Sequence, residues 1–368
     1  MIKEMRNLNK LPVKTWKWLN VNELTLDNID FDESIKYNIN AVNEINNDDL
    51  QISKNINAVM KKIDISSIDD KIDYGVSNDL VNIAKQNCNS SYVIYSKKNK
   101  KIEKPVILNY AQSKQNPLLI DNNVIVAEEG SSITCVIKYS NLDDEKTLHN
   151  GLTTIYAKKN SNVKVVFIQN MNKYSSHFNS LVQYIGQNAN VEIDFIELGS
   201  KIVAINSVTD LLKYESSINI KAMYLGYNNM KIDIDYDILH KGENTKSKIE
   251  QKGALNDSSE KVFKGTIDFK KGAKKAIGSE EESVILLSPK AKSDAIPILL
   301  CSEEDVSGSH AATVGKIDQS KLFYIMSRGF TKAQAQRLII EASYSNIIDS
   351  MPDEKIKSEI IENIQRRL

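Results

Sequence analysis

The stretch NSNVKVVFI at residues 160–168 decides the fold, because variants of it recur along the chain. Each copy is a short polar turn followed by the β-branched and aromatic residues of a strand. The fourth residues of the five copies stand at positions 133, 163, 191, 218 and 246, which are 30, 28, 27 and 28 residues apart. A repeat in the range of ~20–50 residues is typical of a solenoid.

A second strand completes each repeat, as at residues 151–157 and 181–185. No helical pattern lies between the strands, which argues against βαβ units. We therefore predict a mainly β fold whose core is a right-handed parallel β-helix. In this fold the strands of successive turns pair at ~4.8 Å, and only the two ends of the solenoid expose unpaired edges.

The chain divides into three predicted regions. Residues 1–90 are expected to be mainly helical, with one helix over residues 49–63 and another capped by Ser77. Residues 91–317 form the predicted β-helix core, and residues 318–368 form a C-terminal helical region. Trp16 and Trp18, the only tryptophans, are expected to anchor the N-terminal arm by burying their rings.

Capping residues mark the helices of the C-terminal region. Asp318 is a good N-cap for a helix over residues 320–326 that ends at Gly329. Thr331 begins a capping box with Gln334. Pro352 is expected at the first position of a last helix. The tail therefore predicts three short helices.

The composition excludes several classes of protein. Lys plus Arg and Asp plus Glu both total 48 in a chain of 368 residues, so the net charge is zero and no general nucleic-acid binder is expected. Cys88, Cys135 and Cys301 form no CxxC pair, which suggests a reducing compartment. No signal-peptide core and no apolar run of ~20 residues occur, so a soluble, cytoplasmic protein away from the membrane is expected.

The sequence contains no strong catalytic motif, and we do not expect an enzyme. The four histidines are too scattered for a helical metal site: His149, His177, His240 and His310. Asp233, Asp235 and Asp237 alternate with apolar residues. This row is expected to be the solvated face of a strand, although aligned carboxylates are also able to bind a hard cation.

His310 is the strongest single candidate for a functional residue. It lies in the stretch SHAATVGKID at residues 309–318, where the strand pattern gives way to the helical one. Its small neighbours leave the imidazole accessible as a metal ligand. The alternative is a histidine that is hydrogen-bonded in a tight turn.

Several short motifs in order resemble the SufB/SufD family of iron–sulfur cluster assembly scaffolds. The SHxATVG form and the tryptophan-containing segment at residues 12–19 are most similar to SufD. The other matching motifs are VFKGTI (262–267), ILLS (285–288), AIP (295–297), LFY (322–324) and SRG (327–329).

The resemblance implies a function and partners. It implies a non-catalytic scaffold subunit of the SUF machinery that pairs with a SufB-like subunit and binds the ATPase SufC. It also implies a transient iron–sulfur cluster at the subunit interface, with His310 as a candidate ligand and no cofactor tightly bound to the isolated chain. The implied SufC-binding region comprises Leu322, Phe323, Tyr324, Ser327, Arg328 and Gly329.

One position departs from the family pattern. Gly308 stands where SufD commonly has a cysteine, so the thiolates are expected from the partner. Cys301 lies seven residues upstream, and Glu303, Glu304 and Asp305 are weaker candidate ligands. Two alternative functions stay open: a self-pairing scaffold homodimer that acts without SufB, and a stand-alone β-helix carbohydrate-active enzyme that uses the row of aspartates.

Overall fold

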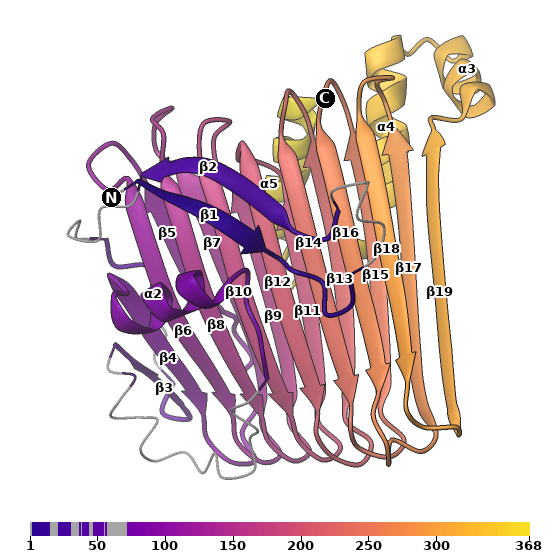
Figure 1. The fold of residues 1–368 in the computed structure, drawn as a ribbon. Helices are drawn as coiled ribbons and strands as arrows, with labels where there is room; N and C mark the ends of the chain where they lie inside the picture. The colour runs from indigo at the N-terminus through magenta and orange to yellow at the C-terminus, as the bar shows by residue number, and fades with distance from the viewer. Residues whose placement is uncertain are drawn as a thin grey trace.

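A computed structural model describes residues 2–14, 21–30, 37, 39–43, 47–54, 56 and 72–368. The chain forms a parallel β-solenoid with three helices in its C-terminal tail (Figure 1). The predicted fold class, a mainly β parallel solenoid flanked by helical segments, is confirmed. Trp16 and Trp18 lie outside the described residues, so their predicted anchoring role is not described further.

The solenoid consists of two parallel sheets, and each turn contributes one strand to each sheet. The first sheet has nine strands and the second has eight, and only β3 pairs antiparallel to its neighbour β4. In order along the chain, the first sheet contains β3 (Leu50–Ser53), β4 (Ser90–Ser96), β6 (Leu118–Ala127), β8 (Leu148–Ala157), β10 (Ser176–Ile185), β12 (Ile202–Leu211), β14 (Lys231–His240), β16 (Glu260–Phe269) and β18 (Lys292–Cys301). The second contains β5 (Val106–Gln112), β7 (Ser132–Asn141), β9 (Asn162–Asn170), β11 (Asn190–Glu197), β13 (Ser217–Gly226), β15 (Lys246–Leu255), β17 (Ala276–Leu286) and β19 (Val306–Lys316).

The polar turn of each repeat reverses the chain between the sheets. Its first residue has a positive φ, as at Asn160 (57°) and Asn188 (52°), a conformation that asparagine tolerates better than most residues. In four of the five turns the next residue carries a hydroxyl group that donates to the carbonyl three residues earlier, as Ser161 does to Lys158 at 2.6 Å, and Ala189 takes this place in the fifth turn. The recurrent turn sequence therefore fixes the repeat length and the register of the stacked strands.

Apolar side chains fill the space between the sheets, which we call the lumen. The ring of Phe195 stacks on Phe167 with centroids 5.3 Å apart and on Tyr236 at 5.4 Å. Each ring comes from a different strand, so these contacts join successive turns and both sheets. The core is therefore continuous along the solenoid axis.

The N-terminal arm covers the outer face of the first sheet. Strands β1 (Ile2–Leu8) and β2 (Leu24–Asp30) form an antiparallel pair that crosses this face, and helix α2 (Asn78–Gln86) packs beside it (Figure 1). The Ser77 side chain caps α2, as predicted. The helix predicted over residues 49–63 is wrong at β3, because its LQIS sequence alternates along a strand that pairs with β4.

Asp233 and Asp235 are buried under the arm, so the predicted solvated face is wrong at these two positions, whereas Asp237 is half-buried. Asn9 Nδ2 donates to Asp233 Oδ1 at 2.8 Å, and Lys264 Nζ lies 2.9 Å from the same oxygen. Burial raises the pKa of both Asp233 and Asp235.

The tail forms three helices: α3 (Gln319–Ser327), α4 (Lys332–Ile348) and α5 (Glu354–Arg367). The Asp318 cap and the Thr331 capping box are confirmed. Pro352 was predicted at the first helical position, but Asp353 caps α5 and Pro352 precedes it. Helices α4 and α5 pack on the outer face of the second sheet, where Tyr344 donates to the Tyr224 carbonyl at 2.6 Å.

Candidate functional site

The last turn of the solenoid is open. Strands β18 and β19 end the two sheets, and each has a strand neighbour on one side only. Every residue of β19 after Val306 is exposed, and β19 stands at the free edge in Figure 1. We call this open last turn, made of β18 and β19, the mouth of the solenoid.

His310 faces the lumen side of the mouth. In β17 the side chains of Gly278, Glu280 and Glu282 point inward and are buried, whereas Ile277 and Glu281 point outward. Strand β19 pairs with β17 in a parallel register that places His310 beside Glu280. Because paired residues of a parallel sheet point to the same face, the imidazole extends over the end of the lumen.

Small residues flank His310 along β19, and larger apolar residues face it from β18. Gly308 and Ala312 occupy the neighbouring inward positions of β19, and Ala295 occupies the position beside buried Phe263 on the facing sheet. A Cβ atom at Gly308 would lie 3.0 Å from the ring of Phe269. The mouth is therefore lined by small residues beside His310 and by Pro297 and Leu299 on the facing strand, and no further turn of the solenoid covers them.

A buried polar group forms the floor of the mouth. Lys261 Nζ lies 2.7 Å from Glu282 Oε1, and both side chains are fully buried. Gln251 Nε2 donates to the same oxygen at 2.6 Å, and the Tyr224 hydroxyl lies 3.2 Å from it. Burial lowers the pKa of Lys261, and the Glu282 carboxylate opposes that shift. The cation and the carboxylate of this pair therefore satisfy each other.

Glu280 shares this floor but has no cation of its own. Its Oε2 lies only 2.2 Å from the position that a Cβ atom on Gly265 would take, so the carboxyl group reaches across the lumen. The same oxygen is buried without a hydrogen-bond partner among the described residues. Burial, with Glu282 nearby, raises the pKa of Glu280 to about 8. Glu280 thus carries one unpartnered carboxyl oxygen among the described residues, one strand from His310.

The other predicted ligands do not converge on His310. A Cβ atom at Gly308 would contact Leu299 at 3.5 Å, which fixes the alignment of the two facing strands. Cys301 is exposed and lies two residues beyond Leu299 on β18. His310 lies two residues beyond Gly308 on β19, in the opposite direction. Cys301 and His310 are therefore separated by ~13 Å along the strand direction. In the loop between them, Glu303 Oε2 accepts from the Gly272 amide at 2.9 Å.

Among the described residues, no group of three or more His, Cys, Asp and Glu side chains is arranged to hold a metal ion. Glu304 and Asp305 are exposed in the loop before β19. His310 therefore has only Glu280 as a neighbouring acidic side chain in the paired register.

The predicted SufC-binding residues divide into an anchor and an exposed surface. Leu322 is buried against α4, whereas Phe323 and Tyr324 are 74% and 58% exposed. Arg328 lies over the Tyr324 ring, 5.2 Å from its centroid, and donates to its hydroxyl at 3.2 Å. Ser327 donates to the Tyr324 carbonyl, and Gly329 ends the helix with a φ of 95°. Helix α3 thus presents apolar rings to solvent beside the mouth.

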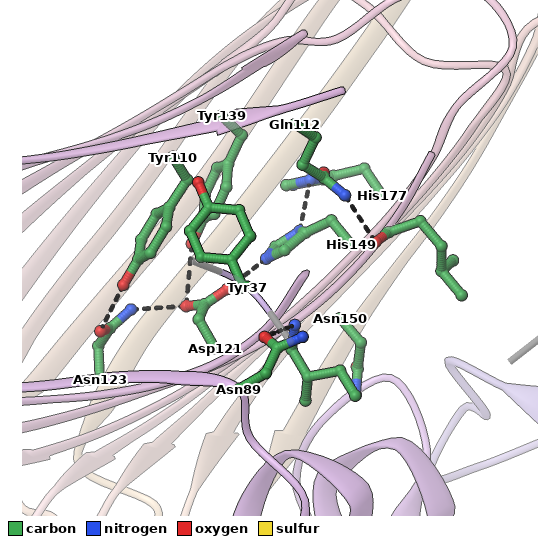
Figure 2. Close-up of polar contacts among 12 residues, drawn as sticks. Tyr37, Asn89, Tyr110, Gln112, Asp121, Asn123, Tyr139, His149, Asn150 and His177 are labelled. Carbon is green, nitrogen blue, oxygen red and sulfur yellow. Dashed lines mark hydrogen bonds and ion pairs between the residues drawn. The ribbon is translucent and has the colours of Figure 1, made fainter. Parts of the chain in front are cut away.

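A second polar cluster lies deep in the lumen, and sequence reasoning missed it. His149 and His177 stand 28 residues apart, which is one repeat, and the register pairs them (Figure 2). Their Nδ1 atoms are 2.8 Å apart, and His149 Nε2 lies 2.5 Å from Asp121 Oδ1. The Tyr139 hydroxyl donates to the other carboxyl oxygen of Asp121 at 3.3 Å.

This cluster is sealed from solvent. Both imidazoles and the Asp121 carboxyl group are completely buried, and burial lowers the pKa of His149 to about 3. A Cβ atom at Gly151 would lie 2.7 Å from His149 Nε2, so glycine leaves the space that this ring occupies. We assign the cluster to the packing of the interior, since no exposed group joins it in the contacts shown in Figure 2.

These features define the chain as a parallel β-solenoid protein with a covered middle, an open C-terminal mouth and a helical tail. The family described as SUF system FeS cluster assembly, SufBD core domain, matches residues 110–343. The chain belongs to this SufB/SufD family, and the resemblance predicted from its motifs is confirmed.

Individual relatives agree with the family match. The iron-sulfur cluster assembly protein SufD of Bacillus subtilis is 28% identical over 282 residues, which are 76% of this chain and 64% of that protein. SufD of Escherichia coli is 27% identical over 240 residues, which are 65% of this chain and 57% of that protein. The chain spans less than two thirds of the length of these relatives. Among the described residues, no helix has the length and apolar character needed to cross a membrane.

Proposed function

We propose that this protein is a non-catalytic scaffold subunit of the SUF machinery that pairs with a SufB-like subunit through the mouth of its solenoid. The observation that carries the proposal is the open last turn with a lumen-facing histidine. Strand β19 has eleven residues, and its outer backbone groups have no strand partner in the described chain. Such an edge is a template for pairing with another strand.

His310 would contribute to a transient iron–sulfur cluster at this interface. Imidazole nitrogen is a suitable ligand for iron, and the position of His310 over the lumen makes it accessible to a partner's ligands. Gly308 supplies no thiol, and Cys301 is held away from His310 along the strand direction. The thiolates would therefore come from the partner, and the isolated chain would hold no tightly bound cofactor.

Helix α3 would bind the ATPase SufC. Phe323, Tyr324 and Arg328 form an exposed aromatic and cationic surface of the kind enriched at protein interfaces. Leu322 anchors the helix to α4 at the edge of the mouth. Nucleotide-driven movement of SufC would thus be transmitted to the turn that carries His310.

The test is co-expression with a SufB-like subunit and SufC, followed by anaerobic iron and sulfide analysis. We expect His310→Ala to lower iron and sulfide in the purified complex while all three subunits still co-purify. Ser309→Ala, on the outward side of the same strand, is the matched control and should match the unchanged protein. Unaltered iron and sulfide in His310→Ala would remove His310 from the mechanism.

The open mouth equally supports a homodimer, because two copies are able to pair by the same edge. Sedimentation velocity of the purified chain, alone and with a SufB-like subunit, distinguishes the two assemblies. A stable homodimer that persists in the presence of the SufB-like subunit would favour self-pairing over the hetero-complex.

A further inference from the structure

The floor of the mouth contains one carboxyl group that the scaffold role leaves unexplained. Glu282 is neutralised by Lys261 and accepts from Gln251, so its charge has partners. Glu280 is 4% exposed, and its Oε2 has no hydrogen-bond partner among the described residues. A buried carboxyl oxygen without a donor is unfavourable unless a cation or another donor reaches it.

The register puts this carboxyl group one strand away from His310. Neighbouring strands lie ~4.8 Å apart, so the two inward-facing side chains are able to reach one common ligand. The absence of a side chain at Gly265 makes room for the Glu280 carboxyl group itself, and Gly308 and Ala312 leave space beside His310 along β19. The opening toward solvent is on the His310 side, because β19 is the last strand of its sheet.

We propose that Glu280 and His310 together form a two-ligand site for ferrous iron in the mouth of the solenoid, an inference that rests on the proposed function. One imidazole nitrogen and one carboxylate oxygen are a donor set that suits ferrous iron. The remaining ligands come from water in the isolated chain and from the partner subunit in the complex. The site would thus receive iron before thiolates complete its coordination.

The donor set also separates this site from the other polar groups of the lumen. His149 and His177 bind each other and Asp121, so their nitrogens are engaged except for one buried atom. The Lys261–Glu282 pair already carries its own cation. Glu280 with His310 is the pair that combines an unpartnered oxygen with an accessible nitrogen.

The test is an anaerobic titration of the purified chain with Co²⁺, used as a spectroscopic substitute for Fe²⁺, and then with Fe²⁺ in competition. The unchanged protein should bind one ion and develop visible d–d absorption. Glu280→Gln should weaken binding at least ~10-fold, and His310→Ala should weaken it at least as much. Glu281→Gln is the matched control, because Glu281 points outward from the same strand, and it should bind as the unchanged protein does.

The result that overturns the proposal is Co²⁺ and Fe²⁺ binding by Glu280→Gln at the affinity of the unchanged protein. Thermal unfolding of each variant, recorded without metal, shows whether a loss of binding reflects a loss of fold. Glu280→Asp keeps the carboxylate and should retain part of the affinity, whereas a purely structural role for Glu280 predicts no difference between the Asp and Gln variants. Sedimentation with the SufB-like subunit separates the two proposals: metal binding without pairing contradicts the proposed function alone, and pairing without metal binding contradicts this inference alone.

Discussion

The middle of the solenoid and its mouth share one repeat but have opposite surroundings. All ten residues of β10 are buried, whereas β19 is exposed along nearly its whole length. In the middle, the rings of Phe167, Phe195 and Tyr236 fill the lumen. In the mouth, the inward positions near His310 hold Gly308 and Ala312 on β19 and Pro297 and Leu299 on β18, and no further turn covers them. The same backbone therefore serves stability where it is covered and interaction where it ends.

The largest expected effect is a loss of stability when the packing in the middle of the solenoid is disrupted. Phe195→Ala removes the central ring of the stack, and we expect a loss of about 3–5 kcal/mol in the free energy of unfolding. Val314→Ala removes apolar volume from the exposed strand β19 and should change that free energy by less than about 0.5 kcal/mol. Urea-induced unfolding of the two variants measures the contrast. Equal losses would show that the mouth is packed as tightly as the middle.

A smaller effect concerns a buried carboxyl group of the middle. Burial raises the pKa of Glu197 from its ordinary 4.5 to about 8, so the folded state holds a proton that the unfolded state releases. The protonated Glu197 side chain contributes fully to the free energy of unfolding below pH 4.5, and this contribution is lost as the pH rises through 8. Glu197→Gln has no such loss. We expect its free energy of unfolding at pH 8.5 to be higher than that of the unchanged protein by roughly 2–4 kcal/mol.

The pH dependence itself checks the assignment. The advantage of Glu197→Gln should shrink as the pH falls toward 4.5, because both states of the unchanged protein then hold the proton. Unfolding midpoints at pH 5, 7 and 8.5 provide the measurement. A constant difference between the two proteins across this range would contradict a buried, protonated Glu197.

The smallest expected effect concerns the tail beside the mouth. Thr331 accepts from the Gln334 amide in the capping box of α4, and Thr331→Ala should cost about 1 kcal/mol. Thr331→Ser keeps the hydroxyl group, so its free energy of unfolding should fall by only a few tenths of a kcal/mol. If both variants lose stability equally, the hydroxyl group is not what stabilises the start of α4.

The features of the fold that the sequence predicts are those that depend on contacts within one repeat or between neighbouring repeats. The repeat that includes Asn160 and Ser161 predicted the turns and the strands because its contacts are local or lie one repeat away. The caps at Asp318 and Thr331 were found for the same reason. Motif order also led to the correct family.

What the sequence did not predict depends on contacts between distant segments. The Asp233 carboxylate is covered by Asn9, 224 residues away, and no local pattern encodes that cover. The pairing of His149 with His177 could have been predicted, because their spacing equals one repeat. That prediction required applying the repeat register to individual residues. Glu280 could likewise have been placed beside His310 only by aligning β17 with β19.

Hydrogen exchange at β19 tests the central claim most directly. The amides of Val306–Lys316 that face away from β17 have no strand partner in the isolated chain and should exchange rapidly. In the complex with a SufB-like subunit, we expect the same amides to become protected, while the middle strands stay protected in both samples. Equally rapid exchange of these β19 amides in a verified complex would contradict pairing through the mouth.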